Sequence, residues 1–323
     1  MKKKTFLAFF AVFILLFCLC AFIACGKTSN EGKTVVTTIF PEYDWVKNVL
    51  GDNTDVNVVL LQDSGADLHN YTPSPEDVVT LSTCDLFIYV GGESDKWVED
   101  ALKNAINKNM QVLNLMEILG DRAKEEELAE GMEGEEEEED EEGEVEYDEH
   151  VWLSVRNAAI FTEAIARALG KIDPDKADTY LQNARAYNES LTAMDNEYQA
   201  AVAAAGKKTL LFGDRFPFRY LIEDYGLQYY AAFLGCSAET EASFETIVFL
   251  ASKVDELDLH TVLTIESSDG RIARTIVQNT QKKNQAILAM DSLQSATKKE
   301  YAAGKTYLSV MRSNLEILKA ALA

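Results

Sequence analysis

The segment DPDKADTYLQNARAYNESLTAMDNEYQAAVAAA, residues 173–205, has the pattern of one long helix within a chain of 323 residues. Asp173 can cap this helix, and Pro174 suits its first position because that position needs no N–H donor. Apolar residues then recur every three or four positions: Leu181, Ala184, Tyr187, Leu191, Met194, Tyr198 and Val202. At about 1.5 Å per residue, roughly 32 residues span about 48 Å. A helix of this length can join two domains stiffly.

Strand and helix patterns alternate on both sides of this segment. Before it, strand patterns occupy residues 34–40, 56–61, 86–90 and 112–113, with helical patterns between them. After it, strand patterns at 209–212, 227–232, 262–265 and 287–290 alternate with helical patterns, and a last helix is predicted over 297–322. Strands separated by helices indicate a mainly parallel sheet.

The fold class that follows is α/β, with two lobes of mainly parallel sheet joined by a long rigid connecting helix. The chain is also longer than a single hydrophobic core usually supports. We expect an N-terminal lobe at 34–171, the connecting helix at 172–206 and a C-terminal lobe at 207–323.

The first residues have the features of an export signal. Lysines at positions 2–4 precede an unbroken apolar run, and the sequence Phe22-Ile23-Ala24-Cys25 resembles a bacterial lipobox. We expect a lipoprotein signal peptide at 1–24, lipidation of Cys25 and a tether at 25–33. An uncleaved signal anchor is the alternative, because the apolar run is long enough to cross a bilayer. In either case the folded part lies at the extracytoplasmic face of the cell membrane.

The net charge of -24 is concentrated in one segment. Between Asp121 and Glu149 eighteen acidic residues stand against two basic ones, and residues 135–142 are continuously acidic. Like charges at this density resist compaction, so 119–147 is predicted to be a disordered surface insertion. It could gather divalent cations or be a solvated loop without a role. Nucleic acid is excluded as a partner, because phosphate binding requires a basic face.

Only two cysteines, Cys84 and Cys236, lie beyond the predicted lipid anchor. An oxidising compartment permits a disulfide between them, but nothing in their spacing requires one. Cys84 follows an apolar helical pattern and precedes a strand pattern, where a small buried thiol is expected.

Two of the three histidines lie in loop sequences that present an imidazole. His69 begins the sequence HNYTPSP, and His150 lies in DEHVWLS, directly after Asp148 and Glu149. Imidazole is the commonest side-chain metal ligand, and its other ring nitrogen usually binds a carboxylate or carbonyl, which Asp148 or Glu149 could supply. A surface or structural histidine is the alternative for each. His260 precedes a strand and is expected at the surface.

Acidic residues follow three strands of the predicted C-terminal lobe: Asp214, Glu266 and Asp291. His69 follows a strand of the N-terminal lobe in the same way. Open parallel sheets bind ligands beyond the carboxyl ends of their strands, so these residues are expected at a metal cleft between the lobes. Two imidazoles with one or two carboxylates suit Zn²⁺, and equally Mn²⁺ or Fe²⁺. Each carboxylate taken alone also fits a helix cap or a surface charge.

Nearly the whole chain beyond the leader resembles the metal-binding lipoproteins that serve ABC importers of zinc and manganese, the cluster A-I solute-binding proteins. The motifs that carry the resemblance are VVTTIFP at 35–41, HNYTPSP at 69–75, DEHVWLS at 148–154, the connecting helix and TYLSVMR at 306–312. The resemblance implies a cleft between two lobes and a helical connector with little hinge motion. It also implies a metal held by His69, His150, Asp291 and one further residue.

The further residue is where this chain departs from the family's pattern. Zinc members commonly have a histidine, and manganese members a glutamate, just after the first strand of the second lobe. The comparison places Arg215 at that position, and a guanidinium cannot bind a cation. Asp214, Glu241 or Glu266 could complete the coordination of the metal instead, or water could.

The leading hypothesis is a monomeric extracytoplasmic lipoprotein that captures a divalent transition metal, Zn²⁺ or alternatively Mn²⁺, and delivers it to the permease of an ABC transporter. No reaction is required, so the chain is not expected to be an enzyme. A zinc-dependent hydrolase is one alternative, because two histidines and an aspartate with an open position also form a catalytic set. Against it, the chain contains no HExxH motif. A surface adhesin with a structural metal is the other alternative.

Overall fold

A computed structural model describes residues 32–134, 146–237 and 241–323. Residues 33–323 form one compact unit. The predicted signal peptide, the lipidation site Cys25 and nearly all of the tether lie outside the described residues. Among the helices that the structure does describe, none is both long and apolar enough to cross a membrane.

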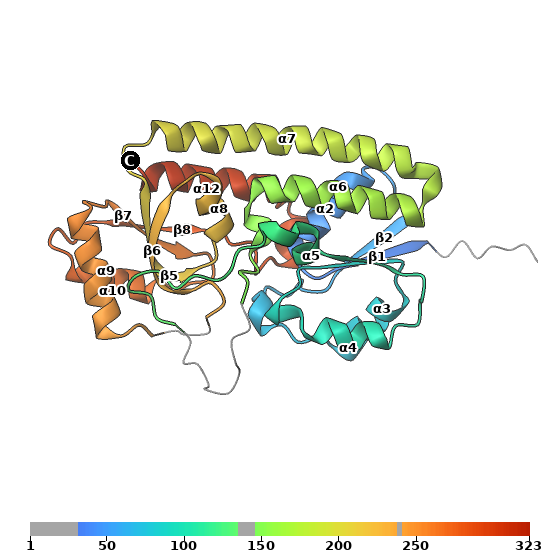
Figure 1. The fold of residues 1–323 in the computed structure, drawn as a ribbon, viewed down its shortest axis with the longest axis horizontal. Helices are drawn as coiled ribbons and strands as arrows, with labels where there is room; N and C mark the ends of the chain where they lie inside the picture. The colour runs from blue at the N-terminus through green and yellow to red at the C-terminus, as the bar shows by residue number, and fades with distance from the viewer. Residues whose placement is uncertain (1–31, 135–145, 238–240) are drawn as a thin grey trace, which may run out of the picture. The chain divides into compact units, whose positions relative to one another are not determined.

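The N-terminal lobe is built on a sheet of four parallel strands in the order β2-β1-β3-β4 (Figure 1). The strands are β1 (Lys33–Thr37), β2 (Val56–Leu60), β3 (Leu86–Tyr89) and β4 (Gln111–Asn114). Neighbouring residues of β1, Val35 and Val36, are fully buried in two different apolar clusters. Both faces of this sheet are therefore covered, which explains why the strand is an unbroken apolar and β-branched run.

Helices cover the two faces of the N-terminal sheet in separate sets. On one face lie α2 (Phe40–Leu50) and α6 (Val155–Ile172), which contribute to the main core, together with the short α5 (Leu115–Leu119). On the other lie α3 (Pro75–Thr83) and α4 (Trp97–Lys103). The sequence itself fixes where α2 begins. The Glu42 carboxylate accepts hydrogen bonds from the N–H groups of Thr38 at 2.8 Å and Ile39 at 3.3 Å, and these bonds cap the first turn of the helix.

The C-terminal lobe repeats the strand order of the first, as β6-β5-β7-β8, again all parallel. Its strands are β5 (Thr209–Phe216), β6 (Gln228–Leu234), β7 (Thr261–Ile265) and β8 (Ala286–Met290). The helices are α8 (Arg219–Asp224), α9 (Phe244–Glu256), α10 (Arg271–Asn279), α11 (Lys298–Ala302) and α12 (Tyr307–Ala321). The predicted single helix over 297–322 is wrong, because the chain turns at Gly304, whose φ of 99° favours glycine.

The long helix α7 (Ala177–Ala204) runs along both lobes (Figure 1). All the residues of its predicted apolar stripe are buried except Leu181, which is half-buried, and Tyr180 is buried as well. At its N-terminal part, Asn183 Nδ2 donates to the carbonyl of Val49 in α2 at 2.9 Å. Towards its C-terminal end, Tyr198 Oη donates to the carbonyl of Met311 in α12 at 2.6 Å. The fold is thus two parallel-sheet α/β lobes on a common long helix.

The described flanks of the acidic insertion belong to the folded body. Glu126 N donates to the carbonyl of Glu146 at 2.8 Å, and Glu133 N donates to the carbonyl of Ala232 in β6 at 3.0 Å. Met132 is buried in the main core. The prediction of disorder for 119–147 misses these contacts, because the sequence shows the charge of a segment but not the strand with which it will pair. Residues 135–145, the most acidic part, lie outside the described residues.

Candidate metal centre

The His69 imidazole is held in place by both of its neighbouring loops. The residue lies in a single 3-10 turn, Leu68–Asn70, after β2, and its backbone N–H donates to Asp67 Oδ1 at 3.1 Å. Its Nδ1 lies 2.8 Å from the hydroxyl oxygen of Ser94, which is on the loop after β3. With its side chain only 12% exposed, the ring has one nitrogen fixed and the other, Nε2, directed to the interior.

The His150 imidazole is fully buried and is oriented by Asp148. Asp148 Oδ1 accepts hydrogen bonds from the backbone N–H of His150 at 2.8 Å and from its Nδ1 at 3.0 Å. A carboxylate can only accept, so the proton of the neutral ring is on Nδ1 and Nε2 keeps its lone pair. This is the arrangement in which a carboxylate prepares an imidazole to bind a metal.

The two rings approach each other through their Nε2 atoms. His69 Nε2 and His150 Nε2 are 3.2 Å apart. A tetrahedral Zn²⁺ with Zn–N distances of about 2.0–2.1 Å separates two nitrogen ligands by about 3.3 Å, so the pair fits one ion. Without metal, His69 Nε2–H can donate to His150 Nε2. Metal binding then requires the His69 proton to move to Nδ1, where the Ser94 oxygen accepts it.

The electrostatics of the pair keep at least one ring neutral. Burial, reinforced by the neighbouring His150 ring, lowers the pKa of His69 to about 3. Burial also acts to lower the pKa of His150, but the charge and hydrogen bond of Asp148 outweigh it and the pKa is raised. Burial raises the pKa of Glu149, whose Oε2 lies 4.0 Å from His69 Nδ1. His69 therefore keeps a lone pair for a metal even below neutral pH.

A third group that can bind a metal lies beside the two imidazoles, and it is Cys236. The ligand atoms of His69, His150 and Cys236 all lie within 4.8 Å of one another. Cys236 comes two residues after the end of β6, so the carboxyl-end rule that selected the acidic candidates also applies to it. From the sequence, this thiol is expected only as a possible disulfide partner of Cys84. The structure contains no disulfide between Cys84 and Cys236.

The carboxylate of Asp291 follows β8 and is engaged by other groups. Its Oδ2 forms an ion pair with Lys305 Nζ at 2.9 Å, and its Oδ1 accepts from the N–H of Leu293 at 2.8 Å. Glu266, after β7, accepts from the hydroxyls of Ser292 and Ser295, both at 2.9 Å. Neither carboxylate is in the compact group around the two imidazoles.

The remaining acidic candidates differ in exposure. Asp214 is buried, its Oδ1 accepts from the N–H of Arg215 at 2.9 Å, and burial raises its pKa. Glu241 has an 81% exposed side chain, which forms an ion pair with Arg271 at 3.5 Å. Arg215, which the sequence analysis placed at the family's ligand position, pairs with Asp67 at 2.6 Å. His260 is exposed, as predicted.

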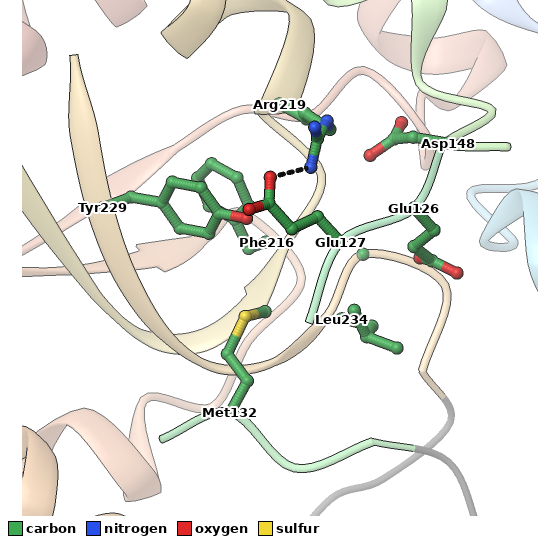
Figure 2. Close-up of a pocket in the computed structure, with 9 residues that line it drawn as sticks. Glu126, Glu127, Met132, Asp148, Phe216, Arg219, Tyr229 and Leu234 are labelled. Atoms are coloured by element: carbon green, nitrogen blue, oxygen red, sulfur yellow. Dashed lines mark hydrogen bonds and ion pairs between the residues drawn. The ribbon is translucent and has the colours of Figure 1, made fainter. Parts of the chain in front are cut away.

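Two hollows lie near the site. A pocket of about 10 Å³ is lined by Asp148, by Glu127 and Met132 of the insertion and by Arg219 of the C-terminal lobe. Figure 2 shows the Asp148 carboxylate pointing toward Arg219, which pairs with Glu127 of the insertion at 2.7 Å. A cleft of about 400 Å³ runs between Asn70, next to His69, and the C-terminal lobe at Asp214, Arg215 and Ser237. The loop of His69 therefore borders the larger cleft through Asn70, whereas Asp148, the partner of His150, lines the smaller pocket.

Two α/β lobes on one long helix, with an imidazole pair at the cleft between them, define a solute-binding protein of the metal-binding class. The chain belongs to the family described as "Zinc-uptake complex component A periplasmic", whose match covers residues 35–321. The resemblance stated from the sequence motifs is thereby confirmed.

Known relatives cover the chain over almost its whole length. The zinc-binding lipoprotein AdcA of Streptococcus pneumoniae serotype 4 is 32% identical over 314 residues, which are 95% of this chain and 60% of AdcA. The high-affinity zinc uptake system protein ZnuA of Bacillus subtilis is 29% identical over 322 residues, 96% of this chain and 97% of ZnuA. The crystal structure of the Zn(II)-bound ZnuA-like domain of S. pneumoniae AdcA has a TM-score of 0.70 at 29% identity and covers 90% of this chain and 99% of that domain. The chain spans 56% to 60% of the length of the AdcA relatives.

Proposed function

We propose that this chain binds a Zn²⁺ ion between its lobes, outside the cytoplasm, and delivers it to the permease of an ABC importer. The observation that carries the proposal is the approach of His69 Nε2 to His150 Nε2 at 3.2 Å, with each ring's other nitrogen already engaged. The zinc-binding relatives and the Zn(II)-bound domain support zinc as the cargo. Mn²⁺ is the alternative cargo.

The proposed ligands are His69, His150 and Asp291. Asp291 is outside the compact group of ligand atoms and pairs with Lys305, so its part in binding includes a local rearrangement. Among the further acidic candidates, Asp214 is the one that lines the cleft next to Asn70, the residue after His69. Glu266 is committed to Ser292 and Ser295, and Glu241 is exposed.

The proposal includes the position of the protein in the cell. Residues 1–24 are cleaved as a signal peptide, Cys25 carries lipid, and 25–33 tether a monomer to the extracytoplasmic face of the membrane. Continuous packing of α7 against both lobes supports a body that binds and releases metal without a large hinge motion. No reaction is part of this function, and the family membership favours neither the hydrolase nor the adhesin alternative.

The test uses residues 26–323, the chain without its signal peptide and lipid. Calorimetric titration with Zn²⁺ and with Mn²⁺, together with elemental analysis of the protein as isolated, measures stoichiometry, affinity and preference. We expect one Zn²⁺ per chain and a higher melting temperature with metal, because binding to the native state alone stabilises it. A protein that binds neither ion, or binds them only weakly at many sites, contradicts the proposal.

A further inference from the structure

One group of described side chains is compact enough to hold an ion, and it contains a thiol where carboxylates were expected. Its members are His69, His150 and Cys236, whose ligand atoms lie within 4.8 Å of one another. Asp291 is outside this group and is paired with Lys305. A partly buried thiol beside two oriented imidazoles needs an explanation beyond packing.

The backbone before Cys236 approaches the His150 ring as closely as a residue without a side chain allows. A Cβ atom on Gly235 would lie 2.8 Å from His150 Cε1 and 3.0 Å from the carbonyl oxygen of Phe216. Real Cβ atoms need more space than this, so only glycine permits the end of β6 to lie against the imidazole. The close approach brings the next residue, Cys236, to the ligand atoms.

The Arg215 side chain links the two loops of this arrangement. Its Nη2 donates to Asp67 Oδ2 at 2.6 Å, and its Nη1 donates to the carbonyl of Ser237 at 3.5 Å. Asp67 also accepts from the N–H of His69, and Ser237 directly follows Cys236. A single guanidinium therefore joins the loop of His69 to the loop of Cys236. The residue at the position where the sequence analysis expected a ligand is a positioning residue.

We propose that the Cys236 thiolate is the third protein ligand of the metal, beside His69 Nε2 and His150 Nε2. The proposal rests on the proposed function, because it concerns the same site. On binding, the thiol proton leaves to solvent and a sulfur lone pair forms the bond to the ion. A tetrahedral Zn²⁺ with Zn–S of about 2.3 Å and Zn–N of about 2.0 Å separates sulfur from nitrogen by about 3.5 Å. Because the ligand atoms already lie within 4.8 Å of one another, the sulfur needs to shift by at most about 1 Å.

A thiolate in this position changes which metals the site prefers. Thiolates are soft ligands that favour Zn²⁺, whereas Mn²⁺ favours carboxylate and carbonyl oxygen. A site of two imidazoles and one thiolate, with a fourth position for Asp291, another acid or water, discriminates strongly against Mn²⁺. Cys236 is thus the residue that determines the choice between the two cargo metals.

Cys84 provides a matched control because it is the other thiol of residues 26–323. It is fully buried, its sulfur lies 3.3 Å from Met110 Sδ, and burial raises its pKa to about 12. This is the environment of an inert core thiol. In a Cys84→Ala background, Cys236 is the sole thiol of the protein.

The experiment compares the wild type, Cys84→Ala, Cys236→Ser and Cys236→His, each as residues 26–323. Titration with Co²⁺ is followed by absorption, because a thiolate bound to Co²⁺ gives a near-ultraviolet charge-transfer band that nitrogen and oxygen ligands do not give. Calorimetry then measures Zn²⁺ and Mn²⁺ affinity, and circular dichroism without metal checks that each variant is folded. We expect the band in the wild type and in Cys84→Ala, and its loss in Cys236→Ser.

For Zn²⁺ we expect Cys236→Ser to weaken affinity by more than the about 10- to 100-fold that loss of an outer partner costs, with Mn²⁺ affinity nearly unchanged. Cys236→His should restore Zn²⁺ affinity without the band. If the wild type binds Zn²⁺ but shows no band, and Cys236→Ser binds equally well, the thiolate ligand is refuted while the proposed function stands. If the folded wild type binds no metal, both fail.

Discussion

The two lobes have the same strand order, yet the imidazoles of the first lobe and the carboxylates of the second are engaged in different ways. In the N-terminal lobe, His69 and His150 each have one ring nitrogen held by a protein partner, so the other is already aimed at its counterpart. In the C-terminal lobe, Asp291 and Glu266 are committed to Lys305 and to serines. Under the proposed function, binding therefore begins with the imidazoles, whereas the carboxylates of the second lobe must first leave their present partners.

The largest expected effect on metal binding comes from removing the two imidazoles of the N-terminal lobe. His69→Ala combined with His150→Ala should abolish the gain in stability with Zn²⁺, which for the wild type is about 4 kcal/mol at a free metal concentration about 1,000-fold above Kd. Thermal unfolding with and without Zn²⁺ measures it. His260→Ala, which changes the exposed histidine, is the control and should keep the full gain. A double variant that is still stabilised by Zn²⁺ would move the site away from this pair.

A second test concerns the joint between the lobes. Asp44 of α2 accepts from the N–H of Tyr307 in α12 at 3.1 Å, and burial raises its pKa to about 6. A carboxyl whose pKa is higher in the folded state stabilises most below its unfolded pKa, so this contribution is lost as the pH rises from about 4 through about 6. A shift of about two units corresponds to about 3 kcal/mol. Urea unfolding across this range should show a smaller loss of stability with rising pH in Asp44→Asn than in the wild type.

Tyr187→Phe is the control for the Asp44 experiment. The Tyr187 hydroxyl donates to Asp44 Oδ2 at 3.3 Å, so its removal takes away one partner but leaves the carboxyl in place. The pH dependence should therefore persist in Tyr187→Phe. Equal slopes in the wild type and Asp44→Asn would show that another group is responsible.

Gly235→Ala tests the close approach between the lobes at the site. The added methyl group would meet the His150 ring and the Phe216 carbonyl, so we expect a loss of stability of about 1–3 kcal/mol, as for overpacked cores. Denaturant unfolding of the metal-free protein measures it. Gly206→Ala is matched to it, because nothing lies within 4 Å of that position, and it should be close to neutral. If both variants behave alike, the contact of β6 with His150 is looser than described.

The smallest expected effect concerns the ion pair between Asp291 and Lys305. Lys305→Met removes the ion pair and should free the carboxylate, so we expect Zn²⁺ to bind up to about tenfold more tightly, or about 1.4 kcal/mol. Calorimetry compares Lys305→Met with the double variant Lys305→Met, Asp291→Asn, in which the gain should vanish. Unchanged affinity in the single variant would remove Asp291 from the proposed ligands.

The regular parts of the fold could be predicted because their signals are local. The apolar stripe of α7 recurs every three or four residues, and all of it is buried in the structure apart from the half-buried Leu181. The break between α11 and α12 was missed, although Gly304 lies at the turn, because the apolar pattern continues on both sides of it. A turn that depends on the backbone angle of one residue, here Gly304, does not interrupt the apolar periodicity of the sequence.

The site was only partly accessible from sequence for a different reason. His69 and His150 stand in distinctive loop sequences, and the structure brings them together. Cys236 has no such signal, because its meaning depends on contact with residues far away in the chain. The same holds for Arg215, whose role depends on Asp67 of the other lobe and on Ser237 of its own. The sequence shows which residue types are present, but it does not show which distant residues they contact in the fold.

The pairing of the insertion's flanks with the folded body also bears on how this protein can change over evolutionary time. Glu126 is paired with Glu146, and Glu133 with β6, so the points at which the acidic run leaves and rejoins the body are fixed. The number of acidic residues between these points can therefore change over generations without moving the hydrogen-bonded flanks, so the loop that carries His150 is insulated from the length of the acidic run.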